Sequence, residues 1–272
     1  MDLSESISSY NYLEGFLDKL RARGRYAFTL EEIRNEFPNA SDKALNQNLY
    51  RLKTKNKIVQ IRKEFYAVLL PEYASQGIIP GSLFIDDMMK ALNKNYYVGL
   101  ISAAAIHGAS HQQAMETYII TEKPALRDIK NKKLKINFFV KGKWKKENVI
   151  QVKTDAGYMN VSSPELTALD LMYYIKSLGI NRVVTILEEL VEVVTAKELK
   201  RVAKSYPQKA AIRRLGYALE EVVENEKLGE VLYNSIEDIR GISIPLMPGK
   251  SKEGALNSRW KIIHNVKIES DL

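Results

Sequence analysis

The sequence predicts an α+β protein of two domains, and three observations lead to that fold class. Apolar residues recur at helical spacing on both sides of a central region in which the period changes to two. Prolines, glycines and small polar residues interrupt both patterns between residues 71 and 82, as an interdomain connection does. The 272 residues are enough for two cores. We therefore predict a first domain over residues 1–77 and a second over residues 78–272.

The first domain has the element order of a winged helix-turn-helix. Thr29 is a favourable N-cap for its second helix, and Pro38 ends that helix. The expected elements are a helix over residues 10–23, a strand over 26–28, a helix between Thr29 and Pro38, a third helix after Ser41, and strands over 58–61 and 65–69.

The third helix is predicted to read DNA. Leu45, Leu49 and Leu52 recur at i, i+4 and i+7 after the N-cap Ser41, which defines a buried face. The opposite face carries amide and cationic side chains, which bind base edges and phosphates. The wing tip adds two cations that suit the DNA backbone or minor groove. The candidate DNA-binding residues are Lys43, Asn46, Gln47, Tyr50, Arg51, Lys53, Thr54, Lys55, Lys57, Arg62 and Lys63.

Positive charge is concentrated in two segments of a chain whose formal net charge is +8. Residues 43–63 contain seven basic side chains and no acidic one, which favours a polyanionic partner. Residues 123–146 hold ten basic side chains and one acid. Two interpretations of this second block stay open: a contact with nucleic acid or another acidic partner, or lysines that prevent strand edges from pairing. Its basic residues are Lys123, Arg127, Lys130, Lys132, Lys133, Lys135, Lys141, Lys143, Lys145 and Lys146.

The second domain is predicted to combine a small antiparallel sheet with a helical C-terminal half. Ser162 or Ser163 is expected to cap the helix that starts at Pro164, since proline fits a first helical turn. We expect helices around residues 83–92 and 100–106, strands at 118–120, 134–140 and 149–152, and later helices at 181–194, 196–205 and 209–224.

No metal site, cofactor site or catalytic motif is evident. His107 and His111 have the i, i+4 spacing of a metal pair, but Gly108 is expected to end the helix near His107. His264 stands alone in the sequence. We therefore expect no metal, no cofactor and no enzymatic activity.

Two acidic pairs are candidates for catalytic groups. Gly81 and Ser82 followed by Asp86 and Asp87 resemble the signature of nucleotidyltransferases, but the spacing differs. We therefore interpret both aspartates as charges in a first helical turn. Glu165 and Asp170 lie five residues apart and do not share a helical face, so they make a poor acid–base pair.

Composition places the protein in the cytoplasm. The chain contains no cysteine, as suits a reducing compartment, and it begins without the basic and apolar run of a secretory signal. The most apolar stretch, residues 96–109, is too short to cross a bilayer. We expect no membrane span.

Five fragments of the chain form a recognisable set in this order: Ile61–Val68, Tyr96–Gly108, Ser163–Leu171, Arg214–Tyr217 and Trp260–Asn265. Together they resemble the AbiEi antitoxins of bacterial type IV toxin–antitoxin and abortive-infection systems. In many relatives a glycine occupies the wing turn where this chain has Glu64, so the tip geometry is expected to differ.

The resemblance implies an autorepressor and antitoxin. In that family an N-terminal winged helix binds inverted repeats in double-stranded operator DNA, with two copies binding cooperatively. The C-terminal domain counters a toxin that resembles a nucleotidyltransferase, in general without a stable complex.

Three alternatives stay open. The winged helix could target a nuclease or nucleotide-modifying enzyme, whose DNA cleavage would require added magnesium. The chain could instead be a stand-alone transcriptional regulator. As a protein-interaction scaffold, it would bind its partner without the charges of residues 43–63.

Overall fold

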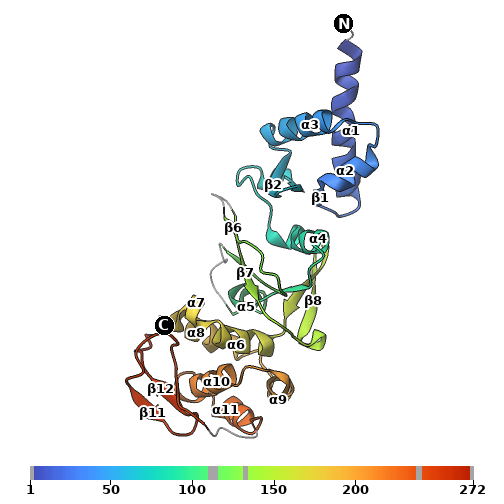
Figure 1. Cartoon of the computed structure of the whole chain (residues 1–272). Helices are drawn as coiled ribbons and strands as arrows, with labels where there is room; N and C mark the ends of the chain where they lie inside the picture. Colours follow the sequence, from blue (N-terminus) through green and yellow to red (C-terminus); the bar gives the residue numbers. More distant parts are fainter. Residues whose placement is uncertain (1–2, 110–115, 131–133, 237–240, 270–272) are drawn as a thin grey trace. The chain divides into compact units, whose positions relative to one another are not determined.

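The computed structural model describes residues 3–109, 116–130, 134–236 and 241–269 and confirms an α+β fold (Figure 1). The chain forms two compact units. Unit 1 comprises residues 1–96, 124–138 and 151–160, and unit 2 comprises residues 97–123, 139–150 and 161–272. Several strands therefore run from one unit into the other, and the predicted boundary after residue 77 stays a prediction.

The first part of unit 1 has the predicted order of a winged helix-turn-helix (Figure 1). The strands pair antiparallel in the order β1-β3-β2, so the wing hairpin β2–β3 holds β1 at its edge. The elements are α1 (Leu3–Ala22), β1 (Ala27–Thr29), α2 (Leu30–Glu36), α3 (Asp42–Thr54), β2 (Ile58–Arg62) and β3 (Phe65–Val68).

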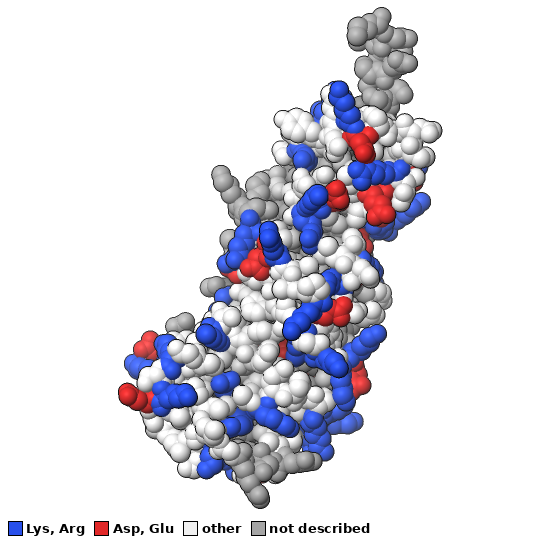
Figure 2. All heavy atoms as spheres, viewed as in Figure 1, with Lys and Arg blue, Asp and Glu red and all other residues white. Residues whose placement is uncertain are grey.

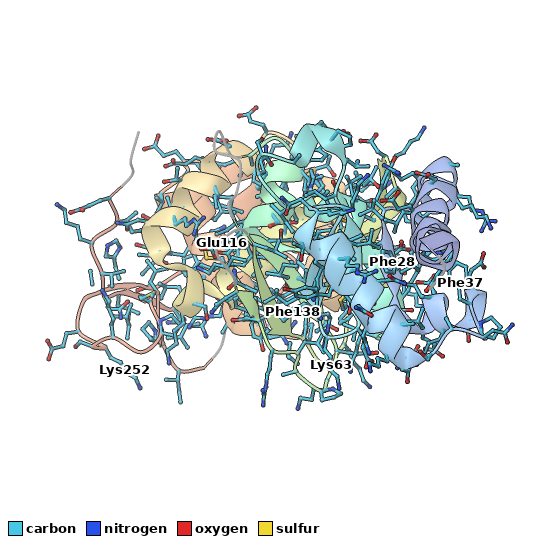
Figure 3. All side chains as sticks on the ribbon, turned by 90° about the horizontal axis from the view of Figure 1, so that it is seen from above. Phe28, Phe37, Lys63, Glu116, Phe138 and Lys252 are labelled. Atoms are coloured by element: carbon cyan, nitrogen blue, oxygen red, sulfur yellow. The ribbon has the colours of Figure 1, made fainter. Side chains whose placement is uncertain are left out.

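Local chemistry explains why α2 starts at Leu30. The hydroxyl oxygen of Thr29 accepts a hydrogen bond from the Glu32 amide at 3.0 Å, and the Glu32 carboxylate accepts one from the Thr29 amide at 2.7 Å. This capping box satisfies two amides that a helix start would otherwise leave unpaired. Phe28 and Phe37, labelled in Figure 3, pack edge-on against Phe16, so apolar contacts hold the helices together around one core.

The middle of the chain builds a six-stranded sheet in the order β6-β7-β5-β4-β9-β8. The sheet is larger than predicted, and its β4–β9 pair is parallel. The predicted strands and helices of this region are present. The sheet also contains β4, β6 and β9, which the alternation of apolar and polar residues in the sequence did not predict. The elements are 3₁₀ turns at Pro71–Tyr73, Gly81–Leu83 and Lys146–Asn148, α4 (Ile85–Ala91), β4 (Tyr96–Val98), α5 (Leu100–Ile106), β5 (Thr117–Thr121), β6 (Ile129–Lys130), β7 (Lys135–Val140), β8 (Val149–Thr154) and β9 (Gly157–Ser162).

The C-terminal half of unit 2 is helical, as predicted, and ends in a small mixed sheet of order β10-β12-β11. Ser163 caps α6 by accepting from the Leu166 amide at 3.2 Å. The elements are α6 (Pro164–Tyr173), α7 (Ile175–Leu178), α8 (Ile180–Leu190), α9 (Ala196–Ser205), α10 (Lys209–Glu221), α11 (Glu226–Tyr233), β10 (Ile244–Pro245), β11 (Ala255–Asn257) and β12 (Ile262–His264).

Candidate nucleic-acid interface

Helix α3 has one buried face and one exposed face, as its sequence predicts. Ser41 caps the helix by accepting from the Ala44 amide at 3.2 Å. Leu45, Leu49 and Leu52 are all buried in the core of unit 1. The inward leucines therefore fix which side of α3 faces outward.

The buried face also contains a polar residue that the leucine pattern did not reveal. Asn48 is buried and donates a hydrogen bond from its side-chain amide to the Tyr12 hydroxyl at 3.0 Å. This bond ties α3 to α1 and satisfies a donor that would be costly to bury alone.

All eleven predicted DNA-binding residues are accessible at least in part. Tyr50 is 66% exposed, an unusual value for a large aromatic side chain. Lys53 donates to the Gln60 side chain at 3.2 Å, and Lys57 lies 3.9 Å from Glu14. The half-buried members are Lys53 and Arg62, and the exposed members are Lys43, Asn46, Gln47, Tyr50, Arg51, Thr54, Lys55, Lys57 and Lys63.

A pocket of about 430 Å³ lies beside the start of α3. Gln47 and Arg51 line it from α3, and Tyr12 lines it from α1. Two of the predicted contact residues therefore border a concave surface, which residues at the start of α3 also line.

The wing turn adopts a strained backbone at Glu64. This residue has φ +58°, in the left-handed region that glycine accepts at little cost, so the departure from glycine noted in the sequence occurs where it matters. The Glu64 peptide oxygen accepts from the Leu30 amide at 2.9 Å, which joins the wing to the start of α2. Its neighbour Lys63, labelled in Figure 3, is exposed.

The second basic block is not exposed throughout, because one of its lysines lies inside the core. On the face of the molecule shown in Figure 2, Lys and Arg side chains are interspersed with acidic ones. Lys141 was counted there as surface charge, which is wrong, because its side chain is 1% exposed and paired with Asp170. Lys132 and Lys133 lie outside the described residues.

Comparison with known proteins identifies part of unit 2. Residues 97–221 match the family model described as the AbiEi antitoxin C-terminal domain. We call these residues the AbiEi domain, after the family that they resemble. The predicted resemblance to the AbiEi antitoxins is thereby confirmed over residues 97–221, and this match supports an antitoxin of a toxin–antitoxin system.

One solved structure shares the fold across most of the chain. The crystal structure of the RV2827C protein from Mycobacterium tuberculosis aligns with a TM-score of 0.68 and 16% sequence identity, covering 94% of this chain and 91% of that one. No curated protein matches the sequence. None of the described helices is long and apolar enough to cross a membrane.

The AbiEi domain contains a buried polar cluster around Asp170 in α6. Its carboxylate accepts hydrogen bonds from the hydroxyls of Tyr97 and Tyr206, each at 2.6 Å, and forms an ion pair with Lys141. Burial lowers the pKa of Lys141, and the Asp170 charge opposes that change. Burial, followed by the Asp170 charge, raises the pKa of Tyr97 and Tyr206 well above the usual value near 10.

Sequence reasoning missed this cluster because it compared Asp170 only with Glu165. The two acids serve different partners: the Glu165 carboxylate accepts from the Thr195 amide at 3.1 Å. The sequence does contain a signal for it, since Asp170 lies between two leucines in a helix whose residues are mostly apolar. A charge in such a helix requires a buried partner.

The two aspartates at the start of α4 have structural partners. Asp86 and Asp87 lie in the first turn of α4, as predicted, where Asp86 accepts from the Tyr96 hydroxyl at 2.8 Å and Asp87 lies 3.5 Å from Arg25. Burial raises the pKa of Asp87, and Arg25 opposes that change.

The histidines form no metal site in the described part of the chain. His107 ends α5, as predicted, and its Nε2 lies 2.7 Å from the Ser162 peptide oxygen. His264 Nδ1 pairs with the Tyr217 hydroxyl, and His111 lies outside the described residues. Among the described residues no three ligating side chains gather for a metal.

Proposed function

We propose that this protein is a cytoplasmic, non-enzymatic type IV antitoxin that represses its own operon. A winged-helix domain of residues 1–77 binds inverted repeats in operator DNA, with two copies cooperating. Residues 78–272 counter a nucleotidyltransferase-like toxin without forming a stable complex with it.

The exposed face of α3 carries the DNA-binding part of this proposal. It presents amide, tyrosine and arginine side chains that can bind base edges, next to lysines that can bind phosphates. The segment 43–63 that contains this face has no acidic residue to repel the DNA backbone.

A gel-shift titration against the DNA upstream of the operon tests this part. Several phosphate contacts release counterions, so affinity should fall by about a thousandfold or more between 50 and 200 mM salt. A shuffled duplex of the same length is the control for sequence preference. Absent binding, or binding that ignores salt, would reject the DNA-binding proposal.

Co-expression with the product of the neighbouring toxin gene tests the antitoxin part. A full-length variant with alanine at Lys43, Arg51, Arg62 and Lys63 should lose DNA binding and still rescue growth. Rescue without co-purification of the two proteins supports neutralisation without a stable complex. A stable complex of the two, or loss of rescue by this folded variant, would contradict the proposed division of labour.

A further inference from the structure

A pocket of about 330 Å³ opens on the AbiEi domain, and none of the residues proposed to bind DNA lines it. One wall is the loop of residues 141–148 between β7 and β8, and the other is built from Leu166 of α6 and from Tyr206 and Pro207 after α9. Its volume lies at the lower end of the range for small-molecule sites, about 300–1,000 Å³. The pocket therefore suits a ligand of nucleotide size.

The floor of this pocket is held in place by the buried cluster. Lys141 and Tyr206 line it, and both bind Asp170. Because the Lys141 charge is already paired, the floor supplies shape and apolar surface. Any attraction for an anion must come from the rim.

One residue that lines the pocket has a side-chain donor without a protein partner. Asn148 is 4% exposed, and its Oδ1 accepts from Arg201 Nη1 at 2.8 Å. Since arginine only donates, this bond fixes the oxygen toward Arg201 and leaves Nδ2 on the other side of the amide. Nδ2 has no hydrogen-bond partner among the described residues and is not one of the fully enclosed unpaired side-chain atoms, so it can donate to a ligand oxygen in place of water.

The rim combines cations with an aromatic ring. Lys143 and Lys145 are exposed, and Lys143 forms no ion pair within the described part of the chain, while Lys145 lies 3.7 Å from Glu147. Trp144, between them, is half-buried and packs edge-on against Tyr97, with ring centroids 5.1 Å apart. A fixed indole next to two ammonium groups is suited to a planar base that carries a phosphate.

We propose that this pocket binds a phosphorylated nucleotide, either free or at the end of a single strand. The base stacks on Trp144, a ligand oxygen accepts from Asn148 Nδ2, and the phosphate meets Lys143 and Lys145. The proposal involves no residue of α3 and so is independent of operator binding.

Tryptophan fluorescence of the full-length protein tests the proposal. The chain has two tryptophans, and Trp260 is fully buried, so a ligand in the pocket should change the emission of Trp144. The probes are the four nucleoside 5′-monophosphates, a 5′-phosphorylated tetraribonucleotide and inorganic phosphate. We expect saturable quenching by a nucleotide probe and none in Trp144→Phe.

The probes also separate the two sources of the ligand. Equal affinity for a monophosphate and the tetranucleotide indicates a free nucleotide, and an affinity at least about tenfold higher for the tetranucleotide indicates a strand end. If no nucleotide gives a saturable change, or if inorganic phosphate binds as tightly as the nucleotides, the proposal is overturned.

Variants measured by calorimetry assign the contacts. Asn148→Asp can still accept from Arg201 but loses the donor, and it should weaken nucleotide binding by at least about tenfold. Lys143→Ala, at an exposed position, should weaken binding by about fivefold and serves as the test if Asn148→Asp does not fold. Lys146→Ala removes an exposed lysine that does not line the pocket and should change affinity by less than about twofold. An equal loss in Lys143→Ala and Lys146→Ala would show unspecific attraction and reject the site.

Discussion

The indole of Trp260 lies directly against the backbone of Gly216 in α10. A Cβ built on Gly216 would lie 2.0 Å from Cη2 of Trp260, well inside van der Waals contact. The indole Nε1 also donates to the Glu220 carboxylate at 2.6 Å. Two of the family fragments, Arg214–Tyr217 and Trp260–Asn265, are therefore the two sides of one packing contact.

Gly216→Ala should destabilise the protein by about 3 kcal/mol, because the added methyl group must displace a fully buried indole. Gly15→Ala is the matched control: Gly15 is also inside a helix, but a Cβ there meets nothing within 4 Å. The control should be stabilised by about 0.5–1 kcal/mol through helix propensity. Urea unfolding of both variants measures these changes. If both substitutions changed the free energy of unfolding in the same direction, the contact between Gly216 and Trp260 would be refuted.

Asp170→Asn should destabilise the protein by about 3–5 kcal/mol, because Lys141 would keep a buried charge without a partner. Adding Lys141→Met to the same chain should recover much of that loss. A double-mutant cycle by urea unfolding gives the coupling between the two residues. If the losses of stability in Asp170→Asn and Lys141→Met simply add in the double variant, the ion pair does not explain the destabilisation.

Stability should fall as the pH rises above about 10, because Tyr97 and Tyr206 must stay neutral in the fold. Their raised pKa values give stability that is complete below the unfolded-state value near 10 and is lost above it, at about 1.4 kcal/mol per pH unit for each tyrosine. The lowered pKa of Lys141 acts in the opposite sense, since its contribution grows until about pH 10.4.

Tyr97→Phe removes one of the two tyrosines, so the free energy of unfolding should fall less steeply with pH, by about 1.4 kcal/mol per pH unit. Unfolding measured by denaturant at several pH values between 8 and 11 gives both slopes. The same slope in the wild type and the variant would mean that Tyr97 does not contribute.

Glu64→Gly should stabilise the wing by about 1 kcal/mol, since glycine adopts φ +58° with little strain. It should also tighten DNA binding at low salt, because it removes a negative charge beside Lys63. Glu64→Gln removes only the charge and keeps the strained backbone, so it should tighten binding without raising the melting temperature. A gain in stability from both variants would show that charge, and not φ, limits the wing.

Arg51→Ala should weaken operator binding by about tenfold and reduce the preference over shuffled DNA, as expected for a base contact. Lys43→Ala should weaken binding to both duplexes alike and lower the salt slope by about 0.9, as one phosphate contact does. Lys197→Ala, an exposed cation in α9, controls for net charge. If all three variants behave alike, α3 is not the recognition helix.

Sequence patterns predicted the elements that local chemistry specifies. Thr29 and Ser41 were recognised as caps because hydroxyl side chains satisfy free amides at helix starts, and the spacing of the leucines in α3 fixed its inward face. Strand β4 was missed because all three of its residues are buried, so it shows no alternation.

Local sequence patterns could not predict contacts between residues that are far apart in the chain. The Asp170 cluster joins residues that are 29 to 73 positions apart, so no local period reveals it. The sequence alone also could not show that Lys141 of the second basic block is buried. Its ammonium forms an ion pair with Asp170 and adds no positive charge to the surface. The orientation of the Asn148 amide depends on Arg201, 53 residues later.

The six-stranded sheet ends on one side at β6, a strand of only two residues. A second molecule that paired with β6 itself would find backbone partners at only these two positions and would meet the exposed ammonium of Lys130. Strand addition onto β6 therefore has a very short template, which disfavours edge-to-edge association through this strand.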